Sequence, residues 1–365
     1  MILVDFSAVM HQMIFASINI VKPKKDKETH KYITDDFIKV TEYRILEELF
    51  NIQTRFSSKY KDIVLCLDNH TAKNWRKNIL STYKSKRKQE HQDSEINFSE
   101  VYEKIDNLVD QIDKYAPWKV IDVASAEGDD CILTLAKNYA KIEPILIISF
   151  DKDMIQAQKY GNVKQFNQIT GKFITVAEKN HSDIKSWLIE HVCLGDEADE
   201  VPKIVDNIKF SQNFKSYLES KKIDVDEYSF AKMSNSEKEN IIGDFNIYQK
   251  DRKGNDTVLD IYAKLRFGPS SLKKVISDYN GLENWLHSNP LLEYNFNINK
   301  RLVLCEYIPD DIEKNIITTY KSSSNKYTEE FRTFLENEQL GNILTILPSN
   351  FSDGKEISVN DLLWW

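Results

Sequence analysis

Four short apolar segments, each followed closely by acidic residues, limit most strongly how this chain can fold. The segments have the length of buried strands and lie at residues 1–6, 63–67, 118–123 and 145–149. Apolar residues at helical spacing fill the stretches between them and predict helices over residues 7–20, 35–58, 98–115 and 127–140, with Ser7 as the first N-cap. Because strands that alternate with helices form parallel units, we expect an α/β fold with a central, mostly parallel sheet and flanking helices.

The rest of the chain has a different pattern. Residues 163–166 and 172–176 predict a hairpin-like pair of strands, and beyond residue 180 the pattern is mostly helical. We therefore predict an α/β domain over 1–180, a smaller helical domain over 181–345 with a polar insertion at about 205–265, and a C-terminal tail over 346–365. The tail ends in Trp364 and Trp365, which either close the core of the second domain or form a docking peptide.

Charge and cysteine usage exclude several classes of protein. No apolar run approaches the roughly 18 residues that span a bilayer, and the first residues lack the features of a signal peptide. The four cysteines lie far apart without a C-x-x-C pair, which argues against a disulfide framework and a cysteine zinc site. We expect a cytoplasmic protein, and the net charge of −8 disfavours nonspecific binding to nucleic acid by the molecule as a whole.

Acidic residues gather where a parallel sheet binds its ligands, beyond the carboxyl ends of the strands. The candidates are Asp5, Asp68, Glu127, Asp129, Asp130, Asp151, Asp153, Asp196 and Asp199. A single acid in such a place is more often a helix N-cap, but pairs such as Asp151 and Asp153 exceed what a cap needs. Asp196 and Asp199 share a face if their segment begins a helix.

So many carboxylates at one edge cannot all stay ionised without cations between them. Oxygen ligands suit Mg²⁺, and two such ions close together stabilise both the attacking and the leaving oxygen of a phosphodiester displacement. The acids therefore predict a centre with two Mg²⁺ ions, for which Mn²⁺ could substitute, and a hydrolytic reaction on a nucleic acid.

One segment of this acidic chain is strongly basic. Its cations are Lys73, Arg76, Lys77, Lys84, Lys86, Arg87 and Lys88. Trp75 and Tyr83 lie among them, and cations interleaved with aromatic rings suit a strand whose phosphates are paired and whose bases stack. We expect a basic helix over 72–91 that binds a polyanion, although a run of charges is often only the solvated face of a helix.

Five acidic segments, in order, carry a resemblance to a known family. LVDFS, IVLCLDN, AEGDDCI, LIISFDKDM and LGDEADEV resemble the motifs of the flap-endonuclease family of 5′ nucleases. NWRKNILSTYKSKRK is similar to the basic bridge segment of such enzymes, and GPSSLKKVI resembles a helix–turn–helix part that binds duplex DNA. The resemblance spans roughly residues 1–200 and 266–345.

The resemblance implies a Mg²⁺-dependent 5′-to-3′ exonuclease or flap endonuclease with RNase H activity. It would hydrolyse RNA primers in RNA–DNA hybrids, and 5′ flaps or ends of duplex DNA, during lagging-strand replication. The nine acids would hold two metal ions, while Arg76 and Lys84 would contact the scissile phosphate with Tyr83 stacked beside them. Residues expected to bind DNA are Lys73, Trp75, Lys77, Lys86, Arg87, Lys88, Ser270, Ser271, Lys273 and Lys274.

Further expectations concern partners and competing functions. The protein would act as a monomer on a flap or nick, with a single-strand-binding protein or sliding clamp as partner, away from membranes; a phage-encoded member would act in its host's cytoplasm. Glu200 stands where the family usually has Asn, and EVPKIVDNIKF replaces a glycine-rich hairpin. Two alternatives therefore stay open: a catalytically impaired DNA-binding factor of the replication fork, and a PIN-like endoribonuclease that cleaves single-stranded RNA.

Overall fold

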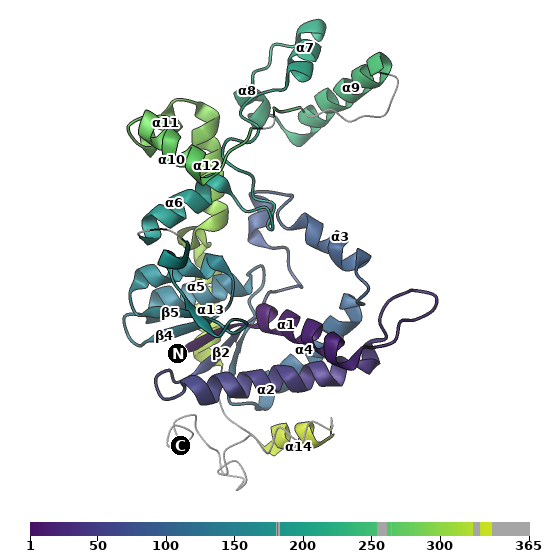
Figure 1. Cartoon of the computed structure of the whole chain (residues 1–365), viewed down its shortest axis with the longest axis vertical. Coiled ribbons are helices and arrows are strands. Elements are labelled where there is room, and N and C mark those ends of the chain that lie inside the picture. The colour runs from purple at the N-terminus through teal and green to yellow at the C-terminus, as the bar shows by residue number, and fades with distance from the viewer. Residues whose placement is uncertain (180, 182, 254–260, 264, 324–328, 338–365) are drawn as a thin grey trace. The chain divides into compact units, whose positions relative to one another are not determined.

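The computed structural model describes residues 1–179, 181, 183–253, 261–263, 265–323 and 329–337 (Figure 1). The chain forms two units. The first consists of Met1–Ile184 together with the chain from Cys305 onward, and the second is Lys185–Leu304. In sequence, the second unit is therefore an insertion within the first.

A six-stranded sheet forms the centre of the first unit. Its strands are β1 (Ile2–Asp5), β2 (Ile63–Cys66), β3 (Lys119–Ile121), β4 (Ile145–Ile148), β5 (Val163–Asn167) and β6 (Lys172–Ile174). They lie in the order β3-β2-β1-β4-β5-β6, and all neighbours are parallel except β5 and β6. This confirms the predicted mostly parallel sheet, and the antiparallel pair confirms the predicted hairpin.

Helices cover both faces of this sheet because its strands are apolar on both sides. On β1, Ile2 and Val4 pack into one hydrophobic cluster, whereas Leu3 packs into the other. The first cluster is completed by α1 (Phe6–Val21), α2 (Ile38–Phe56), α4 (Phe98–Tyr115) and α14 (Glu329–Asn337). The second is completed by α5 (Gly128–Tyr139) and α13 (Asp310–Ser322). The result is a three-layer α/β/α unit, as an alternation of strands and helices predicts.

The basic segment is not the continuous helix expected over residues 72–91. It begins with a single 3₁₀ turn at Trp75–Asn78, continues through turns, and only then forms α3 (Ser85–Asp93). Lys84 lies in the left-handed region, with φ of 52°, which interrupts any right-handed helix at that point. The prediction failed because Arg76 and Tyr83 are drawn into the interior, where they pair with acids of α5. The other short 3₁₀ segments are Thr34–Asp36, Lys152–Tyr160, Val176–Lys179 and Cys305–Tyr307.

The second unit is helical. Its helices are α6 (Ile184–Leu194), α7 (Gln212–Lys221), α8 (Glu227–Lys232), α9 (Asn235–Lys253), α10 (Pro269–Asp278), α11 (Leu282–His287) and α12 (Pro290–Val303). The expected polar insertion at about 205–265 contains α7, α8 and α9, which pack around buried Phe214, Phe230 and Phe245.

The structure places the later part of the chain differently from the predicted division. Residues 181–345 were expected to form one domain, yet the chain rejoins the first unit at Cys305. The reason is packing, because Ile316 of α13 lies in the cluster beneath β3 and Phe331 of α14 contacts the ring of Trp118. The predicted tail at 346–365, with Trp364 and Trp365, lies outside the described residues. In the part of the chain that the structure describes, no helix has the length and apolarity needed to cross a membrane.

The segment after α6 is a tight loop instead of the beginning of a helix. The backbones of Asp196 and Val201 hydrogen bond to each other in both directions, at 2.9 and 2.8 Å. Gly195 is required at its start, because a Cβ there would lie 2.3 Å from the carbonyl oxygen of Val201. Glu200 closes the loop with φ of 59°, a conformation that Asn adopts more readily than Glu.

Replacing Glu200→Asn is therefore expected to raise the free energy of unfolding, by up to about 1 kcal/mol, because it removes the cost of a left-handed Glu. Urea unfolding of the full chain measures this change. Glu197→Asn, in the same loop but without a positive φ, is the matched control and should bring no gain. Equal effects of the two substitutions would contradict the explanation.

Candidate active site

Acids of the first unit converge where the order of the sheet reverses. From β1 the chain continues to β2 and β3 on one side and then returns to β4 on the other, so β1 and β4 border the switch point at which such sheets bind ligands. Asp5 ends β1, Asp68 follows β2, and Asp151 follows β4. Asp129 lies in the first turn of α5.

Hydrogen bonds hold two of these carboxylates in place. Asp5 accepts the backbone N–H of Ala8 at 3.0 Å and the Ser149 hydroxyl at 2.7 Å. Asp5 is thus the N-cap of α1 in place of the expected Ser7, whose hydroxyl donates to Asp68 at 3.0 Å. The other oxygen of Asp68 accepts the backbone N–H of Gly128 at 2.7 Å.

Gly128 is needed for this approach of α5 to β2. A Cβ at this position would lie 2.9 Å from the backbone oxygen of Cys66, a distance that real Cβ atoms essentially never show. The first turn of α5 therefore reaches the end of the sheet only because the residue beside Glu127 has no side chain.

The electrostatics show that these acids act on one another. Burial, together with the charges of Asp151 and Asp5, raises the pKa of Asp129 well above its usual value. Burial also raises the pKa of Asp5 to about 6, and the charge of Asp68 adds to this effect. The group has more negative charge than its surroundings compensate, and its donors are all oxygens. It therefore fits a hard divalent cation such as Mg²⁺.

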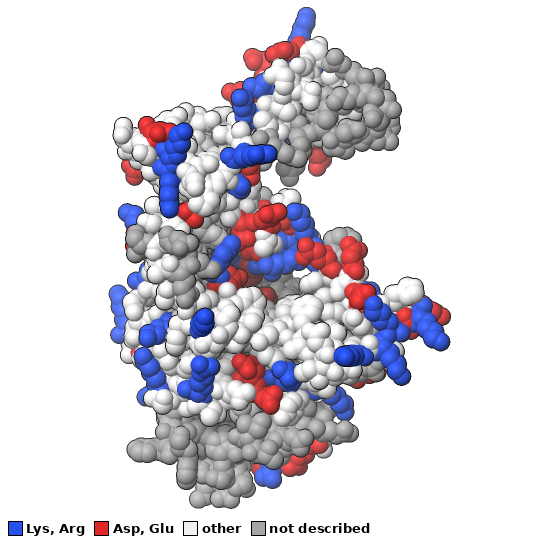
Figure 2. Space-filling view, viewed as in Figure 1, with Lys and Arg blue, Asp and Glu red and all other residues white. Residues whose placement is uncertain are grey.

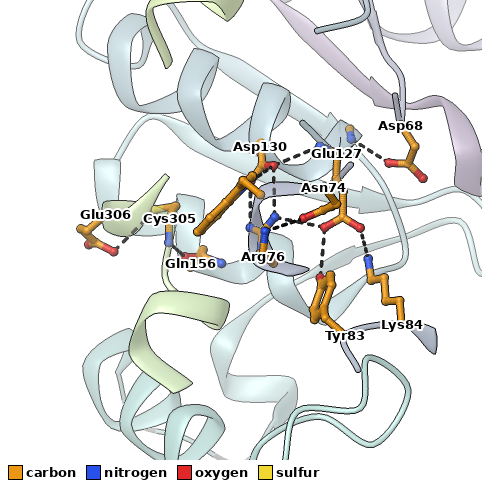
Figure 3. Close-up of polar contacts among 12 residues, drawn as sticks. Asp68, Asn74, Arg76, Tyr83, Lys84, Glu127, Asp130, Gln156, Cys305 and Glu306 are labelled. Atoms are coloured by element: carbon orange, nitrogen blue, oxygen red, sulfur yellow. Dashed lines mark hydrogen bonds and ion pairs between the residues drawn. The ribbon is translucent and has the colours of Figure 1, made fainter. Parts of the chain in front are cut away.

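A second group of charges is fully compensated (Figure 3). Glu127 accepts hydrogen bonds from Lys84 Nζ at 2.6 Å, from Arg76 Nη1 at 3.0 Å and from the Tyr83 hydroxyl at 3.0 Å. Burial alone would raise the pKa of Glu127, but Lys84 and Arg76 outweigh it and lower the pKa to about 2. Glu127 is therefore ionised at all ordinary pH values.

Arg76 and Asp130 form the buried part of this group. Arg76 Nη2 and Nη1 donate to the two oxygens of Asp130 at 2.7 and 3.1 Å, and Trp75 Nε1 donates to Oδ2 at 3.0 Å. Asp130 also accepts the backbone N–H of Glu127 at 3.0 Å. This placement differs from the expected roles, because Asp130 is enclosed by donors and Arg76 is directed into the interior instead of toward a phosphate.

Three predicted ligands remain, Asp153, Asp196 and Asp199. The N–H of Asp153 donates to Asp151 Oδ1 at 2.8 Å at the start of a 3₁₀ segment. Asp196 and Asp199 belong to the second unit, in the bridged loop, where Asp196 Oδ1 accepts the N–H of Ala198 at 2.9 Å. The condition for a shared face, that their segment begins a helix, is not met, and their role as metal ligands stays a prediction.

A cavity of about 760 Å³ opens beside the acids in the first unit, and Asp68, Tyr83, Lys84 and Glu127 belong to its lining. Of the residues expected to bind DNA, Lys73, Lys77 and Arg87 also line it. Figure 2 shows basic and acidic side chains interspersed over the face that it draws, so attraction of a polyanion depends on local groupings such as this one.

The other residues expected to bind DNA have different surroundings. Trp75 is buried against Asp130, and Lys86 is exposed on α3. The side chain of Lys88 is outside the described part. Ser270, Ser271, Lys273 and Lys274 lie on α10, which is followed by a short turn and α11, and both of its lysines are exposed. Binding of duplex DNA by this pair of helices stays a prediction.

Sequence reasoning missed the histidines of the cavity. His11, His70 and His91 come from three separate parts of the chain and all line it. No nucleophile lies near them in the sequence, and only the fold brings them together.

Comparison with known proteins gives the class to which this α/β unit belongs. Residues 1–185 match the family described as 5′-3′ exonuclease, N-terminal resolvase-like domain. The chain therefore belongs to the 5′-3′ exonuclease family. It is similar to ribonuclease H of Enterobacteria phage T4, with 29% identity over 209 residues. The match covers 55% of this chain and 62% of that relative, which is less than two thirds of its length.

Two solved structures from phage T5 are also similar. The T5 D15 protein co-crystallised with metal ions has a TM-score of 0.47 and 14% identity, covering 95% of this chain and 99% of its own. The T5 5′-exonuclease with bound zinc ions has a TM-score of 0.49 and 14% identity, covering 88% of this chain and 98% of its own.

The uncompensated charge of the first group predicts that Asp129→Asn stabilises the metal-free protein. The raised pKa of Asp129 means that the folded state keeps a proton which the unfolded chain has lost, so the penalty is absent only below the ordinary pKa of 3.8 and grows as the pH rises above it. In EDTA at pH 8 we expect the free energy of unfolding to increase by about 1–3 kcal/mol. Urea unfolding at pH 4.5 and pH 8 measures this, and an equal effect at both would contradict it.

The neighbouring substitution should do the opposite. Asp130→Asn leaves the buried guanidinium of Arg76 without its full partner, and breaking a buried pair in this way costs about 3–5 kcal/mol. Thermal and urea unfolding of the two Asp→Asn variants under the same conditions provide the comparison. If Asp130→Asn were as stable as the unaltered protein, the pair would not hold the segment in place.

Proposed function

We propose that this protein is a Mg²⁺-dependent 5′ nuclease. It hydrolyses phosphodiester bonds in the RNA primers of RNA–DNA hybrids and in 5′ flaps or ends of duplex DNA during lagging-strand replication. Membership of the 5′-3′ exonuclease family supports the reaction type, and the name of the phage T4 relative supports an RNA strand as one substrate. The observation that carries the proposal is the gathering of Asp5, Asp68, Asp129 and Asp151 at the end of the sheet, where burial and the charges of Asp151, Asp5 and Asp68 raise the pKa of Asp129.

Asp5, Asp68, Asp129 and Asp151 would hold the divalent ions, with Asp153, Asp196 and Asp199 as further predicted ligands from the resemblance. When bound, such ions supply the activation of water and the stabilisation of developing negative charge that phosphodiester hydrolysis needs. Asp68 is oriented for this by Ser7 and Gly128, and Asp5 by Ser149. These donors fix the orientation of both carboxylates without an ion.

Lys84 and Tyr83 both line the cavity and both donate hydrogen bonds to Glu127. The charge of Lys84 helps to lower the pKa of Glu127. It also counteracts part of the increase in the pKa values of Asp5 and Asp129, so it acts on all three carboxylates. Held by Glu127 at 2.6 Å, it is positioned to offset negative charge on a phosphate that enters from the cavity. Arg76 acts indirectly, because it pairs with Glu127 from the interior and orients that carboxylate.

The acidic edge of the sheet repels a polyanion, so basic residues of the cavity would have to attract it. Lys73, Lys77 and Arg87 supply the attraction in the first unit, and Lys273 and Lys274 of α10 would bind the phosphates of the duplex part. We further propose that the protein acts as a monomer on a flap or nick in the cytoplasm. Its partner would be a single-strand-binding protein or a sliding clamp.

Cleavage of a labelled panel tests the activity. The full chain is incubated with 5′-flap, nicked, RNA–DNA hybrid and plain single-stranded substrates, with Mg²⁺, Mn²⁺ or EDTA. We expect metal-dependent products from the hybrid and the flap, and none from Asp129→Asn, which should still bind the flap. No product with any substrate would favour the fork-binding alternative, and preference for plain single-stranded RNA would favour the PIN-like alternative.

Lys84→Ala should lower kcat by about 10²- to 10³-fold, the usual cost of removing one group that stabilises transition-state charge. Its effect on the Kd for a flap, measured by fluorescence anisotropy, should be small by comparison. Lys104→Ala, an exposed lysine on α4 outside the cavity, is the matched control. A loss confined to Kd would make Lys84 an anchor for phosphate and not part of the reaction.

A further inference from the structure

Aromatic rings form one wall of the cavity beside the acids. His91 stacks on Phe98 with a centroid distance of 4.5 Å and an interplanar angle of 28°. Phe98 stacks on Tyr102 at 5.6 Å and 30°, and Tyr102 stacks on His70 at 6.0 Å and 22°. The four rings come from α3, α4 and the segment after β2, and they form one cluster, in which His91 also lies 5.9 Å from Tyr102 at an interplanar angle of 55°.

A fifth ring supports this cluster, and part of the cluster is accessible. His11 of α1 lies edge-on to Tyr102 at 6.0 Å, and its Nε2 shares a hydrogen bond with the Tyr102 hydroxyl at 3.3 Å. Phe98 is buried, with 7% of its surface exposed, whereas His70 is exposed and His91 half-buried. The two histidines are therefore accessible rings of a supported cluster, and their faces are the ones that another ring could cover.

Cations surround the rings on the remaining lining. Lys31, Lys73, Lys77 and Arg87 line the same cavity, which at about 760 Å³ falls within the range of pockets that enclose small ligands. A single strand of nucleic acid presents phosphates and flat bases in alternation. Cations beside aromatic faces match both parts of that chemistry, and such a surface is indifferent to base identity because every base has a π-face.

We propose that His70 and His91, backed by Phe98 and Tyr102, form a stacking wall for the bases of the unpaired strand next to the cleavage site. The inference rests on the proposed function and makes it more specific, since it assigns recognition of the unpaired strand to its bases as well as its phosphates. His70 and His91 are positioning residues in this scheme, because neither touches the reacting phosphate.

Binding to an overhang without bases tests the wall directly. A duplex with an ordinary 5′ overhang, the same duplex with an abasic sugar–phosphate overhang, and a blunt duplex are titrated with the full chain in EDTA, with fluorescence anisotropy as the readout. The abasic overhang keeps every phosphate, so only base contacts are lost. We expect the unaltered protein to bind the base-bearing overhang about five- to hundred-fold more tightly, the factor that one or two stacked bases supply.

Substitutions assign that preference to the rings. His70→Ala and His91→Ala should each reduce it, whereas His70→Phe and His91→Phe should keep it, because they retain a ring without a titrating group. His287→Ala, an exposed histidine of the second unit, is the matched control and should leave it unchanged. A thermal unfolding scan identifies any variant whose fold has changed.

Two outcomes would overturn the inference: equal binding of base-bearing and abasic overhangs by the unaltered protein, or an equal loss for blunt duplex in the Ala variants. Cleavage is measured separately on the substrate panel. Base-dependent binding without cleavage would refute the proposed function and leave the stacking wall standing. Cleavage without base-dependent binding would refute the wall and leave the nuclease activity standing.

Discussion

The arrangement of the active-site edge depends on the buried ion pair of Arg76 and Asp130. Two charges removed from water are tolerated only with nearly complete pairing, and here the fork of the guanidinium meets both carboxylate oxygens while Trp75 supplies a further donor. The pair fastens the irregular start of the basic segment to α5. Tyr83 and Lys84 consequently reach Glu127, and the cavity acquires its wall on that side.

Adjacent acids thus have opposite functions. Glu127 and Asp130 are saturated by cations and hydrogen bonds, so their charge organises the protein itself. Asp5 and Asp129 are opposed by other carboxylates, which is unfavourable for the isolated chain and favourable for binding a divalent ion. Asp129 and Asp130 follow one another on α5, and a step of one residue along a helix turns the second side chain away from the first. Within a single helical turn, Asp130 thus serves the stability of the fold and Asp129 the proposed chemistry.

Much of this could be predicted from the sequence, and the exceptions have physical causes. The strands, their order of alternation with helices and the acids that follow them were predicted correctly, because apolar runs and periodicity are local signals. The broken basic helix was not, since Arg76 and Tyr83 leave the helical pattern to pair with acids about 50 positions away. The packing of Phe214 against Phe245 and the meeting of His70 with Tyr102 likewise depend on contacts between distant segments, for which one sequence contains no periodicity.

The return of the chain to the first unit has a consequence for synthesis. The last strand, β6, ends at Ile174, but α13, which covers one face of the sheet, begins only at Asp310. At translation rates of about 5–20 residues per second, the part of that face which α13 covers, beside α5, stays open on the ribosome for on the order of ten seconds. Meanwhile the whole second unit emerges and can fold around its own two hydrophobic clusters. The second unit is therefore completed before the first, and a nascent chain finishes its α/β core only after the helical unit has emerged.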